Sequence, residues 1–295
     1  MIVNHVSESV TTLTSEANLS RVKRYYDRTE SRLGYRYILH GTKHYGWYEP
    51  GQSMWQFTAA MRQMEDQLGK RLALPPESEV LDAGCGVGDV ARTMAGKYKL
   101  RVTGIDILDF NLAEARARSA QAGLTERTTF LDGDYHNLQF PDETFDGVYT
   151  METFVHAADP ERALAEFLRV LRPGGRLVMF EYSRTPEEKL SSDASRAFRQ
   201  VCELAAMPTW YRLNHGDLEK MIAAAGWTVD SVENVTERML PMLHAFALIG
   251  RFPYWVGRVS GRTEKVVNAL SGVEMYKYRD AWRYNIYTAT KPIGD

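Results

Sequence analysis

The sequence predicts an α/β fold, namely a Rossmann-like, seven-stranded, mostly parallel and doubly wound sheet with a helical N-terminal cap and helical insertions. Two observations support this prediction. From about residue 78 onward, apolar strand-like stretches alternate with helical stretches, and that alternation is typical of parallel sheets with right-handed crossovers. The chain also has 295 residues, enough to bury roughly three quarters of its unfolded surface without a metal or a disulfide.

The chain before the strand pattern divides into two stretches. Residues 1–20 are rich in Ser, Thr and Asn without any periodicity, which predicts a mobile N-terminal arm. Residues 21–74 are helical in pattern and dense in aromatic side chains, which predicts a helical cap that ends at Pro75-Pro76. Residues 75–295 then form the predicted core.

The core is predicted element by element from its turns and its apolar periodicity. Asp109 is placed to cap one helix, and the pair Asp159-Pro160 marks the start of another. Two stretches, about 183–216 and 237–275, interrupt the alternation and predict helical insertions. The expected strands are 79–82, 100–107, 128–132, 145–151, 176–182, 227–235 and 282–290, and the expected helices are 89–97, 109–123, 160–171 and 217–225.

Composition argues against several classes of protein. The 36 Lys and Arg residues against 38 Asp and Glu give a net charge of −2, whereas a nucleic-acid-binding protein usually has a basic excess. Two cysteines and the lack of a secretory signal favour a cytoplasmic location. No uninterrupted apolar run reaches the length of a membrane-spanning helix, so we expect no nucleic-acid partner and no stable membrane insertion.

The sharpest local signal is a glycine-rich loop that joins a strand to a helix. Its residues are Asp82, Gly84, Cys85, Gly86 and Gly88, and glycine permits a positive φ and a close approach of a ligand to the backbone. A carboxylate at Asp82 would repel a pyrophosphate and attract a cation. S-adenosylmethionine carries a sulfonium and an α-ammonium group, so the loop favours that cofactor.

Two further acids follow the next two strands at matching positions. Asp106 ends the second strand, where an acid can bind both ribose hydroxyls. Asp134 follows the third strand, where an acid can accept from the adenine amino group. Cys85 has no Cys or His at metal-ligand spacing, so we interpret it as a small packing residue and expect no metal. The predicted cofactor set is completed by Ile107, Asn111, Tyr135 and Met151.

These motifs together resemble a known family. The stretch Asp82 to Gly88, the strand-end Asp106, Gly133-Asp134 and the run 171–175 (Leu-Arg-Pro-Gly-Gly) resemble the class I S-adenosylmethionine-dependent methyltransferases. The resemblance covers about residues 78–182 with specific motifs and 217–290 more loosely. It implies an enzyme that binds S-adenosylmethionine and transfers its methyl group.

Segments outside the core resemble a narrower group, the sterol and prenyl C-methyltransferases, including geranyl diphosphate and teleocidin-type terpenoid enzymes. The resemblance rests on the stretches 22–27, 44–47 and 152–157. It implies C-methylation of an isoprenoid alkene through a carbocation, on a prenyl diphosphate or a terpenoid natural product, with Tyr25, Tyr26, Tyr45 and Trp47 at the substrate. The residues after Trp47 are Tyr-Glu-Pro, which departs from the group and leaves the acceptor open.

C-methylation of an alkene requires a base for the last proton and aromatic faces for the cation. Four residues at the ends of the fourth and fifth strands are candidates. A helical turn after Met151 would place Glu152 and His156 on one face. Tyr182 is the third candidate. Glu181 is the fourth, although it could equally be a structural acceptor for backbone donors.

Two alternatives stay open at this stage: an O- or N-methyltransferase of a small-molecule secondary metabolite, and a cofactor-binding protein without turnover. The expected partner is a small apolar acceptor, with a homo-oligomer conceivable through 237–275 or the N-terminal arm.

Overall fold

The computed structural model describes residues 15–26 and 42–294. Most of the predicted arm and the cap residues 27–41 lie outside the described residues. Helix α2 (Ser15–Tyr26) begins within the predicted arm. Residues 15–20 are therefore helical and do not belong to an unstructured arm. Helix α4 (Phe57–Leu72) is the other cap helix among the described residues.

A seven-stranded sheet forms the centre of the molecule, with the order β3-β2-β1-β4-β5-β7-β6. Its strands are β1 (Glu79–Ala83), β2 (Arg101–Asp106), β3 (Thr128–Asp132), β4 (Phe145–Met151), β5 (Leu171–Arg184), β6 (Thr228–Asn234) and β7 (Trp282–Thr290). Strands β1 to β5 pair in parallel, and β7 runs antiparallel to both β5 and β6. The predicted mostly parallel, doubly wound sheet is confirmed.

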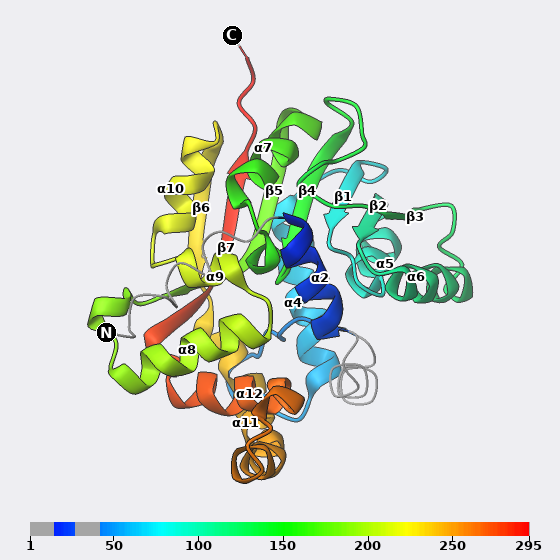
Figure 1. Cartoon of the computed structure of the whole chain (residues 1–295). Coiled ribbons are helices and arrows are strands. Elements are labelled where there is room, and N and C mark those ends of the chain that lie inside the picture. The colour runs from blue at the N-terminus through cyan, green and yellow to red at the C-terminus, as the bar shows by residue number, and fades with distance from the viewer. Residues whose placement is uncertain (1–14, 27–41, 295) are drawn as a thin grey trace.

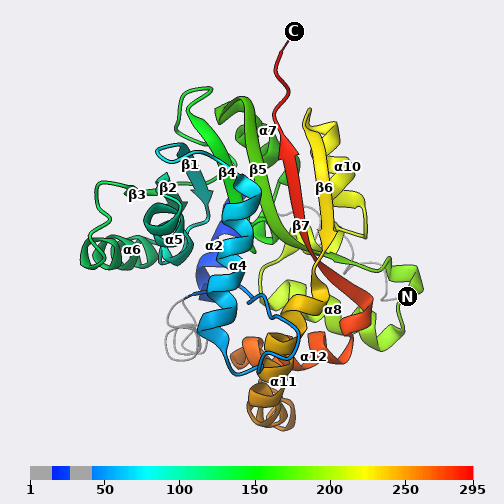
Figure 2. The same ribbon diagram turned by 180° about the vertical axis from the view of Figure 1, so that it is seen from behind.

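Helices cover both faces of this sheet (Figures 1 and 2). One apolar core contains side chains of α4, α5 (Asp89–Lys97) and α6 (Asp109–Gln121). The opposite core contains side chains of α7 (Pro160–Val170) and α10 (Asp217–Ala224). Asp159 caps α7 by accepting from the backbone N–H of Arg162, as predicted. Asp109 is the first residue of α6 and makes no cap hydrogen bond, so that detail was wrong.

The two insertions are helical and lie together beyond one end of the sheet (Figure 1). The first contains α8 (Ser192–Leu204) and α9 (Pro208–Arg212). The second contains α11 (Thr236–Val259) and α12 (Val267–Lys277), which pack against each other. The two helices approach closely at Gly250, where a Cβ would lie 3.0 Å from the carbonyl oxygen of Ala269. No helix among the described residues has the length and apolarity needed to cross a membrane.

Candidate active site

A pocket of about 120 Å³ lies where the parallel strands end, and we call it the donor pocket. Its floor is the glycine loop between β1 and α5. Gly84 has a φ of +101°, and a Cβ there would lie 2.7 Å from the Thr153 side chain. Gly86 has a φ of +53° and faces open space. Gly84 therefore permits the close contact with Thr153, and Gly86 keeps the backbone open toward the pocket; both have the positive φ that glycine permits.

Asp82 is an acid of the donor pocket that has no ion-pair partner within 4.0 Å among the described residues. Its side chain is buried, and its Oδ2 atom has no hydrogen-bond partner among the described residues. Burial, together with the nearby charge of Asp106, raises the pKa of Asp82 to about 7. An unpaired buried carboxyl group that lines a pocket fits a cationic ligand.

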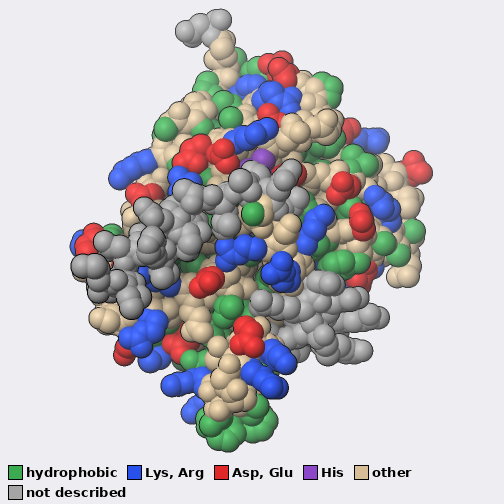
Figure 3. Space-filling model, viewed as in Figure 1, with side chains coloured by type: hydrophobic (Ala, Val, Ile, Leu, Met, Phe, Trp, Pro, Cys, Tyr) green, Lys and Arg blue, Asp and Glu red, His purple; other side chains and the backbone are tan. Residues whose placement is uncertain are grey.

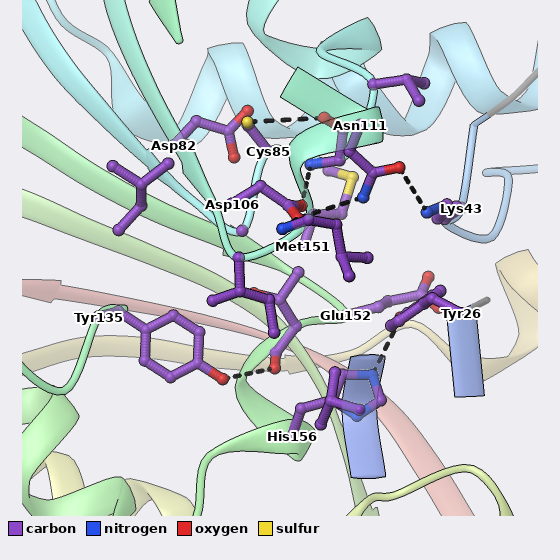
Figure 4. A pocket seen from close by; sticks show the side chains of 18 of the residues that line it. Tyr26, Lys43, Asp82, Cys85, Asp106, Asn111, Tyr135, Met151, Glu152 and His156 are labelled. Carbon is purple, nitrogen blue, oxygen red and sulfur yellow. Dashed lines mark hydrogen bonds between the residues drawn. The ribbon is translucent and has the colours of Figure 1, made fainter. Parts of the chain in front are cut away.

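Asp106 joins the glycine loop to the start of α6. Its Oδ2 accepts from the backbone N–H of Gly86 at 2.9 Å. Its Oδ1 accepts from the backbone N–H of Leu108 at 2.9 Å and from Nδ2 of Asn111 at 3.2 Å. Figure 4 shows Asp106 and Asn111 side by side, with Lys43 of the cap reaching the Asn111 Oδ1 atom at 3.2 Å. Asp106 thus both lines the pocket and fixes its shape.

The rest of the wall of the donor pocket comes from residues at the ends of β2, β3 and β4. Ile107, Tyr135 and Met151 line it, as does Asp134. The Oδ1 atom of Asp134 accepts from the His136 backbone N–H at 2.9 Å and lies 2.5 Å from Nδ1 of the same residue. Burial would raise the pKa of Asp134, but these His136 interactions outweigh it and lower the pKa.

Glu152 stands at the point where the donor pocket meets a second cavity. Its φ is +60°, a left-handed conformation that is rare for a side chain of this kind. Three donors hold its carboxylate: the backbone N–H of Tyr45 at 2.6 Å, the hydroxyl of Tyr284 at 2.8 Å, and the hydroxyl of Tyr182. Burial nevertheless raises the pKa of Glu152. The carboxylate is therefore buried, held in place and more basic than an exposed glutamate.

His156 is neutral and engaged on both ring nitrogens. Nδ1 lies 2.8 Å from the carbonyl oxygen of Ala206, which can only accept. Nε2 is then the acceptor for the Tyr26 hydroxyl at 3.0 Å. Burial lowers the pKa of His156 to about 4. His156 and Tyr26 thus form a neutral pair between cap and sheet, visible in Figure 4.

The second cavity has a volume of about 460 Å³, and we call it the acceptor cavity. Tyr25, Tyr26 and Tyr45 line it from the cap, as the resemblance implied, and Tyr182 lines it from β5. Five residues line both spaces, so the donor pocket and the acceptor cavity meet there: Tyr26, Lys43, His44, Glu152 and His156. The remaining acceptor lining is mainly aromatic or aliphatic, including Trp210, Phe246 and Trp282.

Several residues predicted for the site lie elsewhere. Trp47 is not part of the acceptor lining; its Nε1 atom donates to Glu49, and its ring lies 5.1 Å from the Arg238 guanidinium carbon. Glu181 lines neither space and is fully buried, where its Oε1 accepts from the Phe154 backbone N–H at 2.7 Å. Glu181 is thus the structural acceptor that was left open as an alternative.

Two further expectations need correction. Gly88 does not line the donor pocket; it precedes α5 with a φ of +74°, where a Cβ would lie 2.8 Å from the Phe130 ring. Glu152 and His156 do not share a helical turn, because Glu152 is left-handed and the 3₁₀ turn covers Phe154–His156. The two side chains reach the same junction by this turn.

The sequence analysis did not identify Tyr284 and His44 as residues of the site. Tyr284 lies on β7, the last strand, and no local motif marks it as a partner of Glu152. His44 lies within the motif 44–47 but was considered only as a metal ligand. It is buried, its Nδ1 lies 2.9 Å from the Tyr45 carbonyl oxygen, and its Nε2 lies 3.5 Å from Glu65. Among the described residues, no cluster of three or more His, Cys, Asp or Glu could hold a metal.

Comparison with known proteins identifies the family. Residues 81–179 match the family model described as "Methyltransferase domain". The chain is 35% identical over 283 residues to "S-adenosyl-L-methionine-dependent Diels-Alderase iccD" of Talaromyces variabilis, covering 94% of this chain and 97% of that protein. The chain belongs to the class I S-adenosylmethionine-dependent methyltransferases. As a member of this family it is an S-adenosylmethionine-dependent methyltransferase, and its cofactor is S-adenosylmethionine.

Two other comparisons bear on this methyltransferase. It is 29% identical over 241 residues to the sterol 24-C-methyltransferase of Eremothecium gossypii, covering 79% of this chain and 63% of that protein. Its fold matches the crystal structure of the [4+2]-cyclase SpnF with a TM-score of 0.77 and 25% identity, covering 96% of this chain and 98% of that one. The relatives therefore include proteins named for two different reactions.

Proposed function

We propose that this methyltransferase acts on an alkene of an apolar isoprenoid acceptor in the acceptor cavity and transfers the methyl group to carbon. The junction of the two cavities carries the proposal. The donor pocket opens onto a space of about 460 Å³ at the residues Tyr26, Glu152 and His156. A mainly aromatic and aliphatic lining favours an apolar acceptor, and Lys43 is the one Lys or Arg among the described lining residues.

The reaction needs groups on both sides of the new bond. S-adenosylmethionine supplies an electrophilic methyl carbon on its sulfonium. The alkene π electrons form the new carbon–carbon bond as the sulfur–carbon bond breaks, which leaves a cation on the neighbouring substrate carbon. Asp82 favours the positive end of the cofactor, and Asp106 keeps the loop in the shape that positions it. The rings of Tyr45, Tyr182 and Trp210 line the cavity where the cation would form.

Glu152 is the proposed base for the last proton. It lines both spaces, and burial raises its pKa. Its strained backbone supports a functional role, because such strain persists where the surrounding structure requires it. His156 is a poorer candidate, since its Nε2 already accepts from Tyr26. We propose that the His156–Tyr26 pair positions the cap over the acceptor.

A second candidate function is favoured by the comparisons. A relative matched over 94% of this chain is named a Diels-Alderase, and the SpnF structure is that of a [4+2]-cyclase. In that case a folded polyene in the acceptor cavity would close a ring beside the intact cofactor, and no proton would need to leave. The cofactor's positive charge would polarise the reacting alkene, and the Tyr26–His156 pair would hold the cap over it.

One experiment separates these reactions. The protein is incubated with methyl-labelled S-adenosylmethionine and a panel of sterols, prenyl diphosphates, prenylated indoles and conjugated linear polyenes. Label on carbon supports the proposal, and an unlabelled isomer of the acceptor supports ring closure. Label on oxygen or nitrogen would overturn both.

Glu152→Gln and Tyr182→Phe form a matched pair for the base. Both disturb the same hydrogen bond, but only Glu152→Gln removes the carboxylate. For methyl transfer we expect Glu152→Gln to lower the turnover number by roughly a hundredfold to ten-thousandfold. Tyr182→Phe should cost about tenfold or less, which is the scale of one hydrogen bond. Equal small losses for both variants would exclude Glu152 as the base.

A further inference from the structure

The C-terminal half of α11 carries a patch of exposed apolar side chains. Phe252, Trp255 and Val259 are 73%, 60% and 69% exposed. The rings of Phe252 and Trp255 lie 6.2 Å apart in a stacked arrangement. Ile249 and Val256 extend the patch along the same helix. We call these five residues the α11 patch; the helix that carries them projects from the body of the molecule (Figure 1).

Positive charges surround the α11 patch. Arg251, Arg258, Arg262 and Lys265 are all exposed, and none has an ion-pair partner within 4.0 Å among the described residues. Glu264 is the one acid of the stretch 249–266. Figure 3 shows the hydrophobic end of the molecule with Lys and Arg side chains on both sides of it. Apolar side chains within a basic ring are typical of protein surfaces that bind anionic lipid.

The α11 patch is continuous with the wall of the acceptor cavity. Ile249 belongs to both, and Gly250 and Pro253 of the same helix line the cavity. Val266, between α11 and α12, lines it as well. The same short stretch of chain therefore separates the acceptor cavity from the exposed apolar surface.

We propose that the α11 patch docks on an anionic membrane surface, with Phe252 and Trp255 in the headgroup region. The helix lies at the surface and does not cross the bilayer, in keeping with its apolar length. A second copy of the chain fits the patch less well, because a two-fold contact would bring the four cations of each copy together. A further consequence, which depends on the proposed function, is that an apolar acceptor passes from the lipid into the adjacent cavity.

Vesicle co-sedimentation with the full chain tests the docking. We expect binding to phosphatidylcholine vesicles that contain phosphatidylserine, weaker binding to phosphatidylcholine alone, and release at high salt. The double variant Phe252→Ser/Trp255→Ser should lower the partition coefficient by at least about tenfold. Arg258→Glu should lower it by at least about fivefold, since each basic residue near an anionic surface has an effect of this size.

Two matched controls replace an exposed apolar side chain and an exposed cation that lie outside the α11 patch. Ile293→Ser removes an apolar side chain that is 78% exposed, near the C-terminus at the opposite end of the molecule. Lys220→Glu reverses an exposed charge on α10. Both should bind vesicles as the wild type does, and all variants should keep the wild-type melting temperature.

Three results would overturn the proposal: no binding to the anionic vesicles, patch variants that bind as well as the controls, or a patch-dependent dimer that does not bind vesicles. Vesicle binding requires no turnover, so its failure is distinct from a failure of the proposed reaction.

Discussion

Asp82 allows a quantitative test of the donor pocket, because its charge should cost stability when the pocket is empty and favour binding when it is filled. The perturbation is Asp82→Asn, which keeps the shape of the side chain and removes the charge. Asp82 is buried, and its Oδ2 has no partner among the described residues. The amide therefore replaces the carboxyl group without breaking a hydrogen bond of that oxygen.

The effect on stability follows from the pKa of Asp82. Burial first, and then the charge of Asp106, raise this pKa from 3.8 to about 7. The folded state therefore holds the proton more tightly than the unfolded state. The stability that this gives is complete below about pH 4 and is lost as the pH rises through about 7. Three units of pKa correspond to about 4 kcal/mol, an upper value for the stabilisation of Asp82→Asn above pH 7 without cofactor.

The effect on binding has the opposite sign. A cationic cofactor favours the charged carboxylate, so its binding below about pH 7 releases up to one proton. The affinity of the wild type should rise by up to about tenfold per pH unit between about pH 5 and 7, and level off above. In Asp82→Asn the affinity should be lower at neutral pH, and this rise should be absent.

Calorimetry in two buffers with different heats of ionisation measures both the affinity and the released proton. Thermal unfolding without cofactor measures the stability. Asp134→Asn is the control, because Asp134 lines the same pocket but its pKa is lowered, so it should leave the pH dependence intact. An affinity that is independent of pH in the wild type, or unchanged in Asp82→Asn, would refute the assignment of Asp82 to the positive end of the cofactor.

Three further predictions follow from the same geometry. Asp106→Asn should weaken cofactor binding roughly tenfold to a hundredfold, because hydrogen bonds to a charged group are lost; unchanged affinity in calorimetry would remove Asp106 from the site. Gly84→Ala should abolish cofactor binding in an equilibrium dialysis assay, since its Cβ would lie 2.7 Å from Thr153 at a φ of +101°; retained binding would contradict the packing described here. Trp47→Leu should leave turnover and product unchanged and cost at least about 0.5–1 kcal/mol in chemical denaturation, the value of the cation–π contact between its half-buried ring and Arg238; a large loss of turnover would place Trp47 back in the active site.

The sequence by itself determined the sheet and the glycine loop and acids at its edge that line part of the donor pocket. The third, fourth and last strands and helix α5 have the predicted bounds, because their apolar periodicity and the turns beside them are local signals. The glycine loop, Asp82 and Asp106 were also predictable from sequence. They lie where strands end, and the ends of parallel strands meet at one edge of a sheet.

Only the tertiary structure decided which aromatic and acidic side chains line the acceptor cavity. Tyr45 and Trp47 are two positions apart, yet Tyr45 lines the cavity and Trp47 does not. Between them Gly46 passes so close to α4 that a Cβ would lie 2.5 Å from the Cβ of Ala60. That approach depends on a helix packed from elsewhere in the chain, and so it leaves no local pattern.

The same reason separates Glu152 from Glu181. Glu152 follows β4 and Glu181 lies near the end of the neighbouring β5, and the sequence could not rank them. Glu152 meets Tyr284 from a strand far along the chain and opens onto both cavities. Glu181 instead turns toward the backbone of the Phe154 turn. Long-range packing, and not residue type or spacing, placed the Glu152 carboxylate at the junction of the two cavities and buried the Glu181 carboxylate outside both of them.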